Sequence, residues 1–142
     1  MLAEKKHIIS ALGGQEILGR KALDFDHLIR EGIPVGSGTF IKQRLKLTNT
    51  QLAETLGVSE RTLTRKKAED RLSVTASDRL FRAASVYAFA CEVLEDRDTA
   101  TLWMHSPQRG LGGRAPIEML QTEAGAHEVE DLLGRIEHGV IS

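Results

Sequence analysis

One run in the first half of the chain, residues 48–67, constrains the fold most, because it predicts two short helices joined by a glycine turn. Thr48 is suited to cap a first helix whose apolar face contains Leu52. Gly57 suits the positive φ that ends such a helix, and Ser59 is suited to cap the next one. This order of cap, glycine turn and second cap is typical of a helix-turn-helix.

The second predicted helix carries a basic stripe. At about 100° per residue, Arg61 and Arg65 lie on the side opposite the apolar Leu63. Arginine can read guanine through two hydrogen bonds, whereas hydroxyl and amide side chains hold phosphates. We therefore predict DNA contacts through Asn49, Ser59, Glu60, Arg61, Thr62, Arg65 and Lys66. The alternative is a solvated helix pair; the agreement of caps, turn and stripe favours DNA binding.

Composition limits the class of protein. A chain of 142 residues is long enough for one compact domain or two small helical ones. Its single cysteine, Cys91, excludes a disulfide framework and suits a reducing compartment. No apolar run approaches the roughly 20 residues of a membrane span, and the opening residues are unlike a signal peptide. We therefore expect a cytoplasmic protein.

Charge is distributed unevenly along the chain, although the net charge is only −1. Residues 41–72 contain eight basic residues (Lys or Arg) and four acidic residues (Asp or Glu). Residues 117–142 contain one basic residue and six acidic residues. The first segment suits contact with phosphate and the second does not.

The remaining periodicity predicts an all-α fold of short helices in three parts: an N-terminal helical segment at 1–34, the helix-turn-helix domain at 35–76, and a central helix with a C-terminal domain at 77–142. Residues 32–38 read as a connector, after which Ser37 or Thr39 can cap a helix. Asp96 and Thr122 are suited to cap later helices.

The longest predicted helix, residues 77–94, is apolar on nearly every face, which indicates burial within the fold or between subunits. Its small residues, Ala84 among them, allow another helix to approach closely, so a dimer seam and a monomeric core both remain open. Phe89 lies in the middle of its one polar stripe, which consists of Arg82, Ser85 and Glu92. We predict an exposed contact point there, the alternative being a core residue.

No catalytic or metal site is apparent from the residue pattern. His127 and His138 lie about 16 Å apart along one helix, too far to share a metal. Cys91 falls on an apolar face, where cysteine usually acts as a small hydrophobe. Because no set of nucleophile, base and orienting group stands out, we expect neither an enzyme nor a cofactor.

Three motifs follow one another near the C-terminus: Leu-Gly-Gly-x-x-Pro at 111–116, Thr-Glu-x-Gly-Ala at 122–126 and Arg-Ile-x-x-Gly-Val at 135–140. Together they resemble the toxin-binding domain of the Xre/MbcA/ParS antitoxins. Residues 61–73 are similar to the Xre-type helix-turn-helix that precedes this domain in the family. The resemblance implies a type II antitoxin whose partner is a RES-domain toxin, an enzyme that degrades NAD or transfers its ADP-ribose.

Family members are largely helical, dimerise, cover the toxin's active-site cleft and often repress their own promoter. The resemblance therefore implies a homodimer within a toxin–antitoxin hetero-oligomer, with operator DNA as the second partner. An alternative is a stand-alone helix-turn-helix repressor whose C-terminal domain binds an effector or a protein.

The acidic C-terminal segment suits the electropositive cleft expected of an enzyme that holds a dinucleotide diphosphate. We expect the last three residues to act as a plug, with two apolar contacts and a terminal carboxylate that mimics phosphate. The predicted toxin contacts are Phe89, Arg135, His138, Gly139, Val140, Ile141 and Ser142. The alternative is that the helical surface alone binds the toxin.

Overall fold

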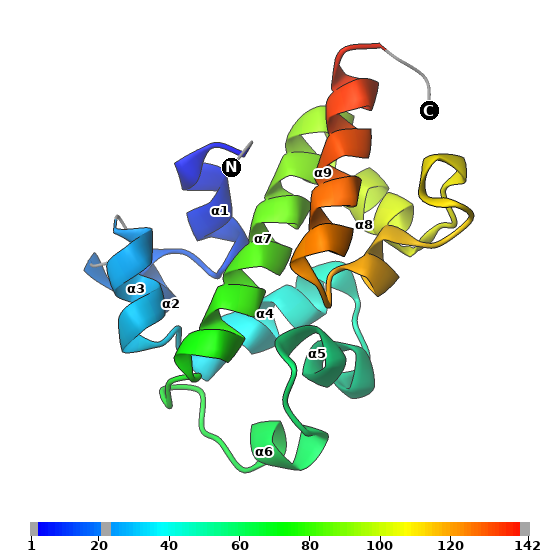
Figure 1. Ribbon diagram of the computed structural model, residues 1–142. Coiled ribbons are helices and arrows are strands. Elements are labelled where there is room, and N and C mark those ends of the chain that lie inside the picture. The colour runs from blue at the N-terminus through cyan, green and yellow to red at the C-terminus, as the bar shows by residue number, and fades with distance from the viewer. Residues whose placement is uncertain (1–2, 21–23, 140–142) are drawn as a thin grey trace.

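Helices make up all the regular structure in residues 3–20 and 24–139, the part of the chain that this computed structural model describes (Figure 1). In chain order they are α1 (Lys5–Ala11), α2 (Gln15–Leu18), α3 (Phe25–Glu31), α4 (Val35–Leu45), α5 (Asn49–Leu56), α6 (Glu60–Thr64), α7 (Val74–Leu94), α8 (Arg97–His105), the short 3-10 helices η2 (Arg109–Leu111) and η3 (Pro116–Met119), and α9 (Glu123–Glu137). The prediction of an all-α fold is confirmed.

The 21-residue helix α7 is the centre of the fold. It packs against α9, α1, α8, α5, α3 and α4 (Figure 1). It begins at Val74, three residues earlier than predicted, because the Ser73 side chain accepts a hydrogen bond from the Ala76 N–H. Ala84 is fully buried by the chain's own helices. The prediction of a dimer seam at Ala84 is therefore wrong, because this side chain packs in the core of a single chain.

The predicted exposure of Phe89 is also wrong, since its side chain is only 3% exposed and belongs to the hydrophobic core. The polar stripe beside it makes contacts within the fold instead of facing water. Arg82 donates to the Leu120 carbonyl, the Ser85 hydroxyl donates to the Phe81 carbonyl, and Glu92 pairs with His7. A polar stripe on a helix therefore did not mark the solvent face here.

Helix α4 begins earlier than its predicted caps, Ser37 and Thr39, because its first turn bonds to a distant segment. The Val35 N–H donates to the Asp70 carbonyl at 2.8 Å, and the Gly36 N–H donates to the Ala68 carbonyl at 2.9 Å. These carbonyls satisfy donors that a side-chain cap usually satisfies. Residues 35–38 are consequently helical, and their prediction as a connector is wrong.

The C-terminal half follows its local signals more closely. Asp96 and Thr122 cap α8 and α9 by accepting hydrogen bonds from the Thr99 and Gly125 N–H groups. Pro116 takes the first position of η3. Within the described ranges, none of the helices combines the length and the apolar character that crossing a membrane requires.

Side chains of α8 hold the end of α4, which leads into the helix-turn-helix. The Thr101 hydroxyl shares its proton between the Arg44 carbonyl and the Arg97 carbonyl of its own helix, each at 3.0 Å. His105 Nε2 lies 2.5 Å from the Leu45 carbonyl, so this nitrogen carries a proton and donates it. We call this pair of contacts the α4–α8 joint. It satisfies two of the four carbonyls that the end of a helix leaves open.

Candidate functional site

Helices α5 and α6 form the helix-turn-helix that the sequence predicts. The Thr48 hydroxyl accepts from the Gln51 N–H at 3.0 Å, while the Gln51 side chain accepts from the Thr48 N–H at 2.9 Å. This reciprocal capping box fixes the start of α5. The Ser59 hydroxyl caps α6 by accepting from the Thr62 N–H at 3.1 Å. The predicted motif and both of its caps are confirmed.

The backbone conformation of Gly57 favours glycine at the turn. Its φ of 71° lies in the left-handed region that favours glycine. A Cβ atom built at this position would lie 1.6 Å from a guanidinium nitrogen of Arg79, so the flexible end of that side chain would have to move. Because Arg79 belongs to α7, the turn of the helix-turn-helix packs directly against the central helix.

Most of the predicted DNA contacts lie on the surface. Arg61 and Arg65 are exposed, and neither forms an ion pair with any residue in the described ranges. Asn49, Ser59, Glu60 and Thr62 are exposed, and Lys66 is half-buried. Helix α6 ends at Thr64, so Arg65 stands just beyond its last turn. These two arginines are therefore free to meet an anionic partner.

Glu60 has a role inside the motif. Its carboxylate accepts a hydrogen bond from the Thr50 hydroxyl and so ties α6 to α5. The Ser59 hydroxyl is engaged with Thr62 through both its backbone N–H and its hydroxyl, the latter at 2.8 Å. The two polar residues at the start of α6 thus also hold the helix in place.

Three of the four predicted toxin contacts that the structure describes lie at the end of α9, whereas the fourth, Phe89, is buried on α7. Arg135, His138 and Gly139 are exposed, and α9 buries its opposite face, with Val129 and Leu132 among the buried residues. This end of α9 and helix α6 lie at opposite ends of α7 (Figure 1). The other predicted contacts, Val140, Ile141 and Ser142, lie outside the described residues.

A groove of about 570 Å³ runs between α7 and α9 and was not anticipated from the sequence. Burial lowers the pKa of Arg82 on one wall and raises the pKa of Glu130 on the other. Asp78 and Glu123 add two further carboxylates to its lining. The groove is therefore mainly acidic and suits a basic side chain of a partner.

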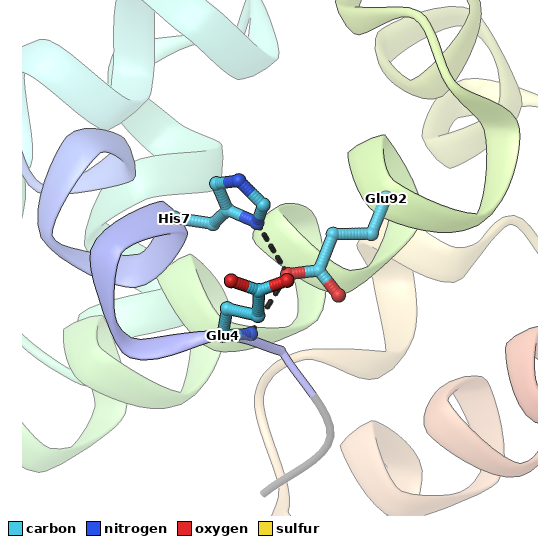
Figure 2. Close-up of side chains that lie close together, drawn as sticks. All are labelled: Glu4, His7 and Glu92. Atoms are coloured by element: carbon cyan, nitrogen blue, oxygen red, sulfur yellow. Dashed lines mark hydrogen bonds and ion pairs between the residues drawn. The ribbon is translucent and has the colours of Figure 1, made fainter.

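A second unanticipated cluster joins α1 to the end of α7 (Figure 2). One carboxylate oxygen of Glu92 accepts from the Glu4 N–H at 2.7 Å and lies 2.5 Å from His7 Nδ1. Potential ligand atoms of the three side chains lie within 4.8 Å of one another, a grouping that can hold a metal ion. This cluster could not be predicted from the sequence, because 85 positions separate His7 from Glu92.

Two protein-family models match this chain, one mainly in its first half and one in its second half. Residues 24–85 match the Antitoxin Xre-like helix-turn-helix domain, and residues 90–139 match the Antitoxin Xre/MbcA/ParS C-terminal toxin-binding domain.

Individual relatives agree. The chain is 33% identical to Antitoxin Xre of Yersinia enterocolitica, over 78% of this chain and 87% of the relative. It is 33% identical to Antitoxin Xre of Photorhabdus laumondii, over 81% of this chain and 79% of the relative. One chain in the crystal structure of the M. tuberculosis MbcT–MbcA toxin–antitoxin complex resembles it with a TM-score of 0.53 and 26% identity. That similarity covers 76% of this chain and 96% of the other.

Proposed function

The chain belongs to the Xre/MbcA/ParS family of antitoxins, and we propose that it binds and inhibits a RES-domain toxin that consumes NAD. The observation that carries this proposal is the match of residues 90–139 to a toxin-binding domain. The family consists of antitoxins and not of enzymes, so this chain would be the inhibitor in the pair.

The surface at the end of α9 supports a docking role. Arg135 and His138 are exposed there, close to the point where residues 140–142 continue the chain. The segment 117–142 carries six acidic residues and one arginine. An acidic surface is drawn to the electropositive cleft that we expect in an enzyme that binds a dinucleotide. Inhibition would follow from blocking that cleft.

We propose that the helix-turn-helix binds operator DNA and represses the antitoxin's own promoter. The side chains of Arg61 and Arg65 support this role, because they are exposed and make no ion pair within residues 3–20 and 24–139. One recognition helix contacts only a few base pairs, so useful affinity requires two copies about one duplex turn apart. Because α6 and the end of α9 lie at opposite ends of α7, a toxin bound at α9 leaves α6 free for DNA (Figure 1).

An inhibition assay tests the proposed function. NAD consumption by the cognate RES-domain toxin is measured with an equimolar amount of the 142-residue chain, of a chain that ends at Gly139, or of the double variant Arg135→Ala/His138→Ala. We expect full inhibition by the first and weaker inhibition by the other two. Arg30→Ala serves as the control, because Arg30 lies on α3 and pairs with the exposed Asp26.

Each outcome has a definite meaning. A full-length chain that neither binds nor inhibits the toxin rejects the antitoxin function and favours a stand-alone repressor. A chain ending at Gly139 that inhibits as well as the full-length one rejects the plug and leaves the helical surface as the inhibitor.

A further inference from the structure

A pocket of about 240 Å³ opens where α1, α4, α7 and α8 meet, away from the surfaces already assigned to DNA and toxin. A cavity needs only on the order of 10–15 Å³ to hold one water, so this pocket has room for a small organic molecule. Its walls include His7, Arg44, Tyr87, Cys91, Glu92 and Arg97.

Two arginines from different parts of the chain face this pocket. Arg44 comes from α4 and Arg97 from α8, and neither makes an ion pair with any residue that the structure describes. Arg44 stacks on the ring of Phe40 at 4.6 Å, which leaves the edge of its guanidinium group free to donate hydrogen bonds. Two positive groups around one hollow repel each other unless an anion lies between them.

Glu92 is the one carboxylate among the described residues that line the pocket, so its negative charge offsets only one of the two arginines. Glu92 is already engaged by His7 Nδ1 and the Glu4 N–H on the α1 side (Figure 2). Tyr87 stays neutral, because burial raises its pKa to about 12, and its hydroxyl lies 3.1 Å from the Thr101 hydroxyl. The pocket is therefore positive at its centre, with neutral and polar groups around it.

We propose that this pocket binds a phosphate group, either as inorganic phosphate or as the phosphomonoester of a small metabolite. Arginine suits this ligand because its planar guanidinium group donates two parallel hydrogen bonds to phosphate oxygens. The ligand would contact α4 of the DNA-binding half and α8 of the toxin-binding half at once. It would therefore act as an effector that stabilises their contact.

Cys91 provides a built-in reporter, since it is the only cysteine in the chain and lines the pocket. Burial raises the pKa of its thiol, while Arg97 and Arg44 act in the opposite direction. A positive pocket attracts anionic iodoacetate more than neutral iodoacetamide. We expect the ratio of the two alkylation rates to be about threefold to tenfold higher in the folded chain than in the same chain unfolded in urea.

Matched variants assign this effect to the pocket. Arg97→Gln and Arg44→Gln should each lower the ratio, whereas Arg109→Gln should not, because Arg109 is an exposed arginine outside the pocket. Arg97 is itself exposed, so its replacement leaves the core intact. Circular dichroism and thermal unfolding check that each variant keeps its fold.

Inorganic phosphate tests binding directly. We expect it to slow alkylation of Cys91 by iodoacetamide in a saturable manner, and Arg97→Gln to abolish the protection. Stronger protection by glycerol 3-phosphate would identify a phosphomonoester as the ligand, and equal protection would identify the phosphate group alone. The proposal would be overturned if Cys91 were alkylated at the same rate in phosphate as in sodium chloride of equal ionic strength. It would also be overturned if the folded chain showed no higher ratio of iodoacetate to iodoacetamide alkylation than the unfolded chain.

Discussion

At the scale of single residues, Arg61 and Arg65 carry the proposed reading of DNA sequence. Replacing either by alanine should cost about 1–3 kcal/mol in operator binding, because a bidentate contact to guanine is lost. Lys66→Ala should weaken binding to every duplex about equally, since a lysine there would contact phosphate. Titrations against operator and scrambled duplexes at two salt concentrations measure both effects. Equal losses on the two duplexes for the arginine variants would reject base reading.

Glu130 allows a prediction about pH. Its pKa lies above the usual 4.5 because burial disfavours the charged form. The folded chain therefore holds this proton more tightly than the unfolded chain. Stability consequently falls as pH rises from the ordinary pKa through the raised one, and the loss is complete at neutral pH. Glu130→Gln should stabilise the fold at pH 7, with a gain that disappears below a pH of about 4.

Urea denaturation at the two pH values measures this difference. Glu128→Gln is the matched control, because Glu128 lies on the same helix with an exposed side chain that pairs with Arg114. A Glu130 variant that behaves like the Glu128 variant at both pH values would show that burial of this carboxylate carries no penalty.

At the scale of elements, α7 determines which substitutions the fold tolerates. Ala84 is fully buried at its centre, so Ala84→Leu adds volume to a packed core. Overpacking of this kind typically costs about 1–3 kcal/mol. Chemical denaturation should show this loss, and Ala124→Leu on the exposed face of α9 should not. Unchanged stability in the Ala84 variant would show that the core around this residue has room for the larger side chain.

Elements were predictable from sequence where their signals are local. Four helix caps are evident from the sequence alone, and each accepts a hydrogen bond from the N–H three residues later: Thr48, Ser59, Asp96 and Thr122. The start of α4 is not evident from the sequence, because the carbonyls that accept from its first N–H groups lie more than thirty positions along the chain. The four-residue helix α2 was also missed, since so short a helix contains no full amphipathic period.

The candidate sites divide in the same way. The exposure of Arg61 and Arg65 followed from helical periodicity around Leu63. The burial of Phe89 could not be predicted from periodicity, because the helices packed against α7 come from distant parts of the chain. The cluster of Glu4, His7 and Glu92 depends on the same long-range packing (Figure 2).

At the scale of the whole molecule, one hydrophobic core runs from α1 to α9. The α4–α8 joint links the helix-turn-helix domain, residues 24–85, to the C-terminal domain, residues 90–139. Thr101→Val and His105→Ala each leave a carbonyl of α4 without its donor, which costs about 1–3 kcal/mol where that group is buried. We expect both variants to lose stability and to bind operator DNA more weakly, although neither residue lies on α6.

Denaturation and DNA titration on the same preparations measure these effects. Ser106→Ala is the control, because Ser106 follows α8 directly and its hydroxyl donates back to the Leu102 carbonyl of α8, not to α4. Wild-type DNA affinity in the Thr101 and His105 variants would mean that the joint holds the halves together without influencing the DNA-binding surface.

The α4–α8 joint also has a consequence for gene control. Under the proposed function, the joint makes operator and toxin effectors of one another, and thermodynamic reciprocity requires the coupling free energy to be the same in both directions. If toxin binding raises the affinity of the antitoxin for the operator, then operator binding must raise its affinity for the toxin by the same factor. The promoter would then report the ratio of the two proteins and not the concentration of either one alone.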